Sequence, residues 1–167
     1  FFCLICSPEI SVMEKIKFSA ELDVFEDQSQ LPQEIQKVMK QAIQARDHAY
    51  APYSSFKVGA ALLMDNNEVV IGSNQENASY PSGLCAERTA IYYAGAKYPQ
   101  MLIKAIAISA KSLHKEITSP IPPCGACRQA ISEYEVNQEK GIPIYFMGEK
   151  GKVYRAKSIK ELLPFIF

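Results

Sequence analysis

A thiol, a carboxylate and a guanidinium stand within four positions in the stretch GLCAERTAIYYAG, which spans residues 83–95. They belong to Cys85, Glu87 and Arg88, and the apolar run after them is typical of a helix packed on a core. A cysteine can bind a metal ion and a glutamate can carry a proton, but a lone cysteine is more often a small buried hydrophobe. Chemistry at Cys85 therefore requires a second motif elsewhere in the chain.

The second motif is PCGAC at residues 123–127, which stands at the start of a predicted helix over about residues 125–134. Its spacing places Cys124 and Cys127 on one side of a helical turn, as tetrahedral zinc requires. With Cys85 they offer three ligands, and three protein ligands beside one open position are typical of catalytic zinc. Both motifs follow turn-forming residues, so we expect both at helix N termini, where exposed amides and the helix dipole favour thiolates.

Glu87 is then a candidate proton carrier rather than a metal ligand. Side chains two residues apart point in different directions on a regular helix, so this hypothesis requires Cys85 to lie at or before the first turn. The two histidines of the chain, His48 and His114, lie outside both motifs. We expect His48 on a helix surface or at an interface and His114 in a loop, with no metal role for either.

Two other interpretations of the cysteines remain open. The CxxC pair alone is also found in thioredoxin-like redox proteins. Alternatively, Cys3 and Cys6 form a second CxxC that could complete a structural four-thiol zinc site with Cys124 and Cys127, which would leave Cys85 without a task. The chain has five cysteines, an odd number with no even framework, so we expect a reducing, cytoplasmic compartment rather than disulfide bonds.

The composition argues against two classes of partner. Lysine plus arginine and aspartate plus glutamate number 18 each, so no overall field attracts nucleic acid or an anionic membrane. No apolar run approaches the roughly 20 residues of a membrane-spanning helix. The apolar residues 1–12 lack the basic region of a secretory signal and precede the first methionine, Met13, so we expect that they are not native.

The pattern of apolar residues predicts one α/β domain over residues 31–167, after a loosely ordered extension over residues 1–30. A helical pattern begins at Leu31, and two strand-like runs at residues 58–64 and 69–73 flank DNNE as a hairpin. Further strands are expected at the runs LIKAIAISA, IPIYFM and GKVYRA, and a short helix at the terminal SIKELLPFIF. Alternating helices and strands after a hairpin predict a three-layer α/β/α fold around a mixed sheet of about five strands.

The two motifs and their surroundings resemble the small homotetrameric, zinc-dependent cytidine deaminases. Nucleobase deaminases carry a His-x-Glu and a Pro-Cys-x-x-Cys signature, and here Cys85 stands in the place of the histidine. The resemblance covers about residues 35–167 and includes the stretches YAPYSSFKVGAALL, NQENASYPSGLCAERTA, SPIPPCGACRQ and ELLP. It implies one Zn²⁺ per subunit, a nucleoside substrate and assembly with copies of the same chain.

The resemblance also implies roles for residues that the pattern alone leaves without a task. It implies that Asn74 and Glu76 bind the ribose hydroxyls, that Phe56 packs against the pyrimidine ring and that the backbone of Ala86 contacts the base edge. It also implies that Arg88 donates a hydrogen bond to a thiolate sulfur, and that Tyr80 and Phe167 reach the site of a neighbouring subunit. The last match rests on the distance from Pro164, and Phe165 is its competitor.

The implied activity is hydrolytic deamination of cytidine and 2′-deoxycytidine to the uridine counterparts with release of ammonia, a step of pyrimidine salvage. One alternative is a deaminase of a cytosine nucleoside antibiotic of the blasticidin S type, which shares the three-cysteine pattern. A second is a deaminase of bases within RNA or DNA, which the balanced charge disfavours. A third is a zinc-stabilised binding module without catalysis.

Overall fold

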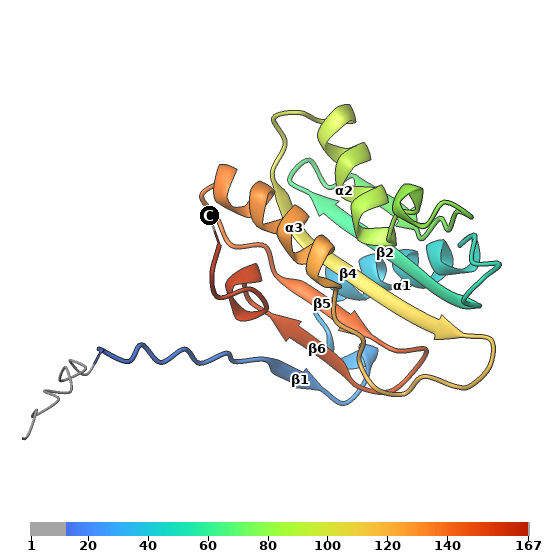
Figure 1. Cartoon of the computed structure of the whole chain (residues 1–167), viewed down its shortest axis with the longest axis horizontal. Helices are drawn as coiled ribbons and strands as arrows, with labels where there is room; N and C mark the ends of the chain where they lie inside the picture. Colours follow the sequence, from blue (N-terminus) through green and yellow to red (C-terminus); the bar gives the residue numbers. More distant parts are fainter. Residues whose placement is uncertain (1–12, 167) are drawn as a thin grey trace, which may run out of the picture.

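The computed structural model describes residues 13–166, so residues 1–12 and Phe167 lie outside the described part of the chain (Figure 1). In chain order the elements are β1 (Asp23–Phe25), η1 (Gln28–Gln30), α1 (Gln33–Asp47), β2 (Phe56–Met64), β3 (Val69–Ser73), η2 (Tyr80–Ser82), α2 (Ala86–Lys97), β4 (Ile103–Ser112), α3 (Gly125–Asn137), β5 (Ile144–Met147), β6 (Val153–Ala156) and η3 (Ile159–Glu161). Among these described residues, no helix is both long and apolar enough to cross a lipid bilayer.

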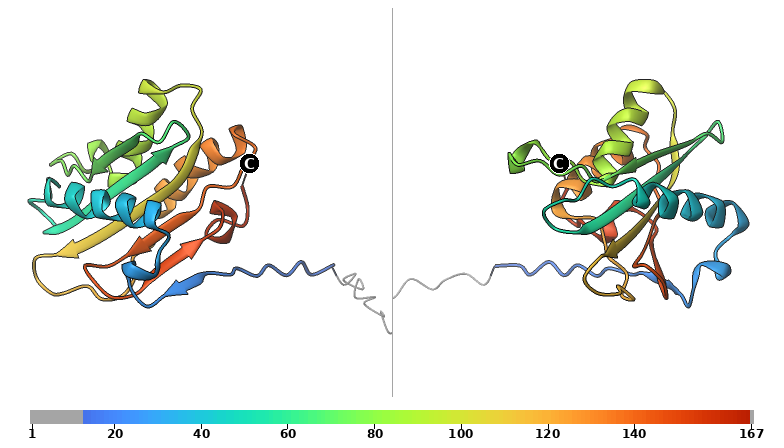
Figure 2. Two further views of the ribbon diagram at one scale, coloured as in Figure 1. Left: turned by 180° about the vertical axis from the view of Figure 1, so that it is seen from behind. Right: turned by 90° about the vertical axis from the view of Figure 1, so that its right-hand side faces the viewer.

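The strands form one mixed sheet in the order β1-β6-β5-β4-β2-β3, with helices on both of its faces (Figures 1 and 2). Alternate residues of β2 show why both faces are covered, since successive side chains of a strand point to opposite sides. Leu62 and Met64 pack in the core beneath α2 and α3, whereas Ala61 and Leu63 pack in the core beneath α1. The predicted three-layer α/β/α fold is confirmed, with six strands rather than about five.

The sixth strand lies in the segment that was expected to be a loosely ordered extension. β1 pairs antiparallel with β6, and Asp23 stands opposite Arg155 in the register. Arg155 Nε donates a 2.7 Å hydrogen bond to Asp23 Oδ2, and the ring of Phe25 lies 6.4 Å from that of Tyr145. The expectation of a loose segment is therefore wrong for residues 23–25, because pairing with a strand far along the chain orders three residues whose own pattern is weak.

The C-terminal segment also differs from its prediction. The expected helix over SIKELLPFIF is a single turn, η3, which Ser158 caps by accepting a hydrogen bond from the Lys160 amide. The Ile159 amide donates to the buried carboxylate of Glu135 on α3, 3.0 Å away. Pro164 lacks an amide hydrogen and disfavours a helical conformation at the residue before it, which explains the early stop.

The connectivity places the beginnings of α2 and α3 at one edge of the sheet. β3 and β4 both run antiparallel to β2, so they run parallel to each other. α2 follows β3 in the chain and α3 follows β4, so both helices start beyond the carboxyl ends of parallel strands. Crevices at the carboxyl ends of parallel strands are where open α/β sheets commonly bind their ligands.

A glycine on β3 allows the first turn of α2 to approach the sheet closely. A Cβ atom at Gly72 would lie 2.6 Å from the carbonyl oxygen of Ala86 and 2.6 Å from the amide nitrogen of Ala90. No real side chain fits at such distances. Gly72 therefore sets the height of the α2 N terminus above the sheet.

Candidate metal centre and active site

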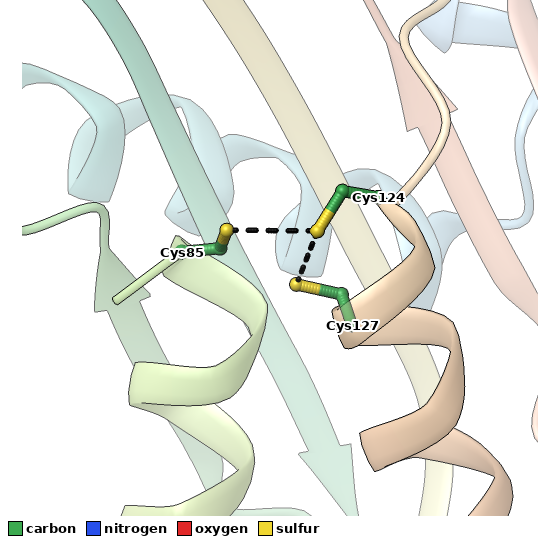
Figure 3. A group of neighbouring side chains, drawn as sticks. All are labelled: Cys85, Cys124 and Cys127. Atoms are coloured by element: carbon green, nitrogen blue, oxygen red, sulfur yellow. Dashed lines mark hydrogen bonds between the residues drawn. The ribbon is translucent and has the colours of Figure 1, made fainter. Parts of the chain in front are cut away.

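Three cysteine side chains meet where α2 and α3 begin (Figure 3). Cys85 is the N-cap of α2 and Cys124 is the N-cap of α3, while Cys127 lies in the first turn of α3. The Sγ atoms of Cys85 and Cys124 are 3.7 Å apart, and those of Cys124 and Cys127 are 3.5 Å apart. The structure thus brings together the three cysteines that the motifs single out, and all three sulfurs lie within 4.8 Å of one another.

These separations fit a zinc ion. Two sulfurs bound to one tetrahedral zinc at about 2.3 Å each lie about 3.8 Å apart. The measured separations of 3.5 and 3.7 Å are close to that value, and Cys127 is buried while Cys124 remains exposed. One side of the cluster is therefore accessible, as a fourth, exchangeable ligand requires.

The surroundings of the cluster favour thiolate at Cys85. A hydrogen bond from the Cys127 thiol lowers the pKa of Cys85 to about 5, and Arg88 and Cys124 act in the same direction against the effect of burial. Arg88 Nη2 lies 3.8 Å from Cys85 Sγ. The same hydrogen bond and burial raise the pKa of Cys127. A cluster with one thiolate already formed is a ready acceptor for a metal cation, since the thiolate is the form that binds.

Cys85 precedes the first turn of α2, which is the condition that the proton-carrier hypothesis for Glu87 sets. Cys85 has an extended backbone, with φ −73° and ψ 156°, and the helix begins only at Ala86. Side chains two residues apart point in different directions on a regular helix, but Cys85 lies before the helix, so this restriction does not apply to Cys85 and Glu87. The Glu87 side chain is only 6% exposed, and burial raises the pKa of its carboxyl to about 7, helped by the charge of Cys85. A carboxyl with a pKa near neutrality can both accept and donate a proton at physiological pH.

A hollow of about 620 Å³ opens beside the cluster. Among the predicted site residues, five line it: Asn74, Glu76, Tyr80, Cys85 and Arg88. Ala86 is fully buried at the start of α2, and Phe56 is half-buried at the start of β2. Five predicted site residues are absent from the lining: Phe56, Ala86, Glu87, Cys124 and Cys127. Phe167 lies outside the described residues.

Asn74 and Glu76 are held in place by backbone groups. Asn74 Oδ1 accepts a 2.7 Å hydrogen bond from the Val58 amide, and Asn74 Nδ2 donates a 2.9 Å bond to the Phe56 carbonyl. An amide retains a further lone pair and a further hydrogen after two such bonds. Glu76 Oε2 accepts from the amides of Tyr53 and Ser54, at 2.8 and 3.3 Å, and hydrogen bonding by Ser54 holds the pKa of Glu76 below its usual value. Both side chains are therefore pre-oriented at the hollow.

Arg128 makes two hydrogen bonds that the sequence motifs do not predict. Its Nε donates a 2.8 Å hydrogen bond to the Pro123 carbonyl, and its Nη1 donates a 2.8 Å bond to the Leu162 carbonyl. Arg128 thus ties the residue before Cys124 to the C-terminal segment. In the sequence, the only indication of a role for Arg128 is its position directly after the CxxC motif. The sequence pattern does not indicate its hydrogen bond to the distant Leu162.

The remaining titratable and aromatic candidates lie elsewhere. His48 caps the C terminus of α1 and is exposed, and His114 is exposed in the loop after β4, as expected. Among residues 13–166, neither histidine belongs to a group of side chains that could bind a metal ion. Phe165 is 71% exposed and its ring packs 4.4 Å from that of Phe18. Cys3 and Cys6 lie outside the described residues, while Cys85, which a four-thiol site would leave idle, joins the cluster.

Comparison with known proteins agrees with this site. Residues 32–139 match the family described as "Cytidine and deoxycytidylate deaminase zinc-binding region". A cytidine deaminase of Halalkalibacterium halodurans is 43% identical over 132 residues, which cover 79% of this chain and 92% of the relative. The chain belongs to the cytidine and deoxycytidylate deaminase family.

Other members of the family support the same placement. A cytidine deaminase of Sporosarcina psychrophila is 37% identical over 134 residues, covering 80% of this chain and 91% of the relative. The crystal structure of cytidine deaminase from Burkholderia pseudomallei superposes with a TM-score of 0.67 at 39% identity, covering 78% of this chain and 97% of that one. The protein is therefore an enzyme of the deaminase family, and the family's zinc-binding region contains all three clustered cysteines.

Proposed function

We propose that this enzyme hydrolyses cytidine and 2′-deoxycytidine to uridine and 2′-deoxyuridine with release of ammonia, in pyrimidine salvage. The observation that carries the proposal is the buried Glu87 in the first turn of a helix whose N-cap, Cys85, completes a three-thiol cluster. Relatives named cytidine deaminase support the substrate class. Residues 31–167 are proposed as the catalytic domain.

In this proposal Cys85, Cys124 and Cys127 hold one Zn²⁺, and Glu87 moves the protons. Zinc supplies a nucleophile at neutral pH, because coordination lowers the pKa of water towards about 7. The Glu87 carboxylate accepts a proton from the attacking water and delivers it to N3 of the base, which makes C4 more electrophilic. It then takes the second proton of that water from the oxygen now bound to C4 and passes it to the amino group, which leaves as ammonia, so one residue serves as base and acid in turn. The pKa of about 7 suits both tasks.

Arg88 is proposed to compensate charge at the cluster. Three thiolates and one Zn²⁺ carry a net charge of −1, which weakens the acidifying effect of the metal. A guanidinium 3.8 Å from Cys85 Sγ and two helix N termini withdraw electron density from the sulfurs. Arg88 therefore helps to keep the metal an effective Lewis acid.

The hollow fits a nucleoside better than a nucleotide. Asn74 and Glu76 are proposed to bind the ribose hydroxyls, Phe56 to contact the pyrimidine ring and the Ala86 backbone to contact the base edge. Among residues 13–166, Arg88 is the only basic residue that lines the hollow, and it is engaged with Cys85. A 5′-phosphate would find the carboxylate of Glu76 there and no free cation from this part of the chain, so like charges would disfavour its binding.

We also propose that the enzyme works as a cytoplasmic homotetramer in which neighbours complete each site. Tyr80 lines the hollow yet is 92% exposed, and its turn, η2, projects from the body of the molecule (Figure 2). A projecting aromatic side chain can reach a neighbouring copy. Phe167, with Phe165 as the competitor, is proposed for the same role. A native mass of four chains, measured at the concentration of the activity assay, tests the assembly.

The direct test follows the ultraviolet absorbance change of cytidine with the zinc-loaded enzyme. Loss of activity on chelation and its return with Zn²⁺ are expected. Blasticidin S and cytidine monophosphate are parallel substrates: turnover of blasticidin S alone would establish the antibiotic-deaminase alternative. Absence of turnover on every substrate by zinc-replete protein would favour a binding module and contradict the proposal.

A further inference from the structure

Residues 13–22 form an extended arm that leaves the body of the molecule before β1 (Figure 1). Within the described part of the chain, the arm donates a single hydrogen bond to the fold, from the Glu21 amide to Glu161 Oε2 at 2.8 Å. All of its residues are exposed. The family match covers residues 32–139, so the arm lies outside the matched region.

The sequence of the arm has the alternation of a strand. Apolar residues occupy one face, and polar or charged residues occupy the other over the same span. The apolar face consists of Ile16, Phe18, Ala20, Leu22 and Val24, and the polar face consists of Lys15, Lys17, Ser19, Glu21 and Asp23. The apolar face is largely open to solvent, because Ile16 is 77% exposed and Phe18 remains 48% exposed beside Phe165. A strand pattern without a partner strand is a ready template for pairing with another chain.

The chain's own sheet does not extend far enough to satisfy the arm. β6 ends at Ala156, and its pairing with β1 runs from Phe25 back to Asp23 opposite Arg155. Ala156, the last residue of β6, could pair with Leu22 but with no earlier residue of the arm, because the chain after Ala156 turns into η3. The other edge of β1 is the outer edge of the sheet. Within residues 13–166, the arm and the outer edge of β1 therefore form one continuous strand edge without a pairing partner.

We propose that the arms of two copies of this chain pair antiparallel about a two-fold axis at Ser19, and so join two sheets at their β1 edges. This register places Lys15 and Lys17 of each copy opposite acidic residues of the other and keeps the apolar residues of the arm, from Ile16 to Leu22, opposite apolar ones, while Val24 of β1 faces Glu14. The facing pairs are Lys15 with Asp23, Lys17 with Glu21, Ile16 with Leu22, and Phe18 with Ala20. Opposite charges directly across two strands stabilise the pairing, and like charges destabilise it.

Neighbouring registers match less well. A shift by one residue of one arm would set the apolar face against the polar face. An axis at Phe18 leaves Lys17 opposite Ser19, and an axis at Ala20 leaves Lys15 opposite Phe25. Only the axis at Ser19 pairs both lysines of the arm with carboxylates. The charges thus specify a second copy of the chain, in one register, as the occupant of the arm.

The first test is zero-length carbodiimide cross-linking of the full-length, zinc-loaded protein. Lys17 and Glu21 are four residues apart in one extended chain, so their Cα atoms are separated by about 13 Å and cannot be linked directly within one arm. We expect a covalent dimer on a denaturing gel whose peptides contain Lys17–Glu21 and Lys15–Asp23 links. A dimer band without these links, or arm links only to the same chain or to other surfaces, would overturn the proposal.

The second test exchanges charges between copies. Lys17→Glu alone places Glu against Glu21 of the other copy, and Glu21→Lys alone places Lys against Lys17, so each variant should lose the Lys15–Asp23 link. An equal mixture of the two variants restores complementary pairs and should restore the link. Lys115→Glu, a matched charge change at an exposed loop residue, should leave the link intact. A mixture that stays unlinked, or single variants that link as the wild type does, would refute pairing between arms.

Discussion

Replacement of Glu87 by glutamine removes a proton carrier and preserves the shape of the side chain. Glu87 is 6% exposed, so bulk water has little access to replace the lost carboxylate. Proton transfer by a positioned side chain contributes about 10²- to 10⁴-fold, which corresponds to about 3–5 kcal/mol of transition-state stabilisation. Because the proposed mechanism uses the same carboxyl in several transfers, we expect kcat to fall by at least the lower figure, with zinc retained.

The same substitution should stabilise the metal-free fold at high pH. Burial raises the pKa of Glu87 from 4.5 to about 7, so the ionised carboxylate is less favourable in the folded chain than in the unfolded chain. The resulting loss of stability is absent below pH 4.5, grows as the pH rises and is complete above about pH 7. A pKa shift from 4.5 to about 7 corresponds to a loss of about 3 kcal/mol in the free energy of unfolding at high pH. The Glu87→Gln protein avoids this loss because glutamine does not ionise.

Two measurements separate these effects. Steady-state kinetics with cytidine and zinc analysis of the purified Glu87→Gln protein give the catalytic effect, and urea unfolding of the chelated protein at pH 4.5 and pH 8 gives the stability effect. Glu68→Gln, at an exposed turn residue, is the matched control and should change neither. Full activity of zinc-replete Glu87→Gln, or a fold that becomes less stable at pH 8, would refute the reasoning.

Three further substitutions have distinct expected outcomes. Arg88→Gln should retain zinc and lower kcat by about 10- to 100-fold, since it removes a group that tunes the metal through Cys85; unchanged turnover of zinc-replete protein would contradict this. Glu76→Gln should raise KM for cytidine about tenfold with little change in kcat, because it weakens a charged hydrogen bond to the ribose; steady-state kinetics on both parameters decide. Gly72→Ala should lower the free energy of unfolding in urea by about 1–3 kcal/mol and weaken zinc binding, because the new Cβ would lie 2.6 Å from the Ala86 carbonyl oxygen. Unaltered zinc affinity would show that this contact does not set the height of α2.

The three-cysteine cluster was predictable because local motifs define it. A CxxC spacing at a helix start and a cysteine two residues before a glutamate single out the three cysteines that the structure brings together. Their convergence, however, depends on the parallel course of β3 and β4, which no local pattern encodes. The double hydrogen bond of Arg128 to Pro123 and Leu162 was out of reach for the same reason, since it joins segments 39 residues apart.

The fold was predictable where periodicity is strong. The hairpin expected at residues 58–64 and 69–73 is observed as β2 and β3, because alternation and a polar turn are local signals. β1 was missed since its three residues become a strand only through pairing with β6. The prediction of a terminal helix was wrong because Glu135 and Ser158 stabilise a single capped turn before Pro164. The pattern of apolar residues does not indicate these hydrogen bonds.

The side chain of Asn74 limits how the proposed active site can be altered. It joins the start of β2 to the end of β3 by bonding both the Val58 amide and the Phe56 carbonyl. Aspartate there would set a carboxylate oxygen against the Phe56 carbonyl oxygen, and an apolar residue would leave two backbone groups unpaired. We therefore expect substrate range to be easier to change from residues 77–81, which are exposed and contribute to the lining of the hollow. A library that randomises that loop and keeps the asparagine should yield folded variants with new sugar preferences more often than one centred on the asparagine.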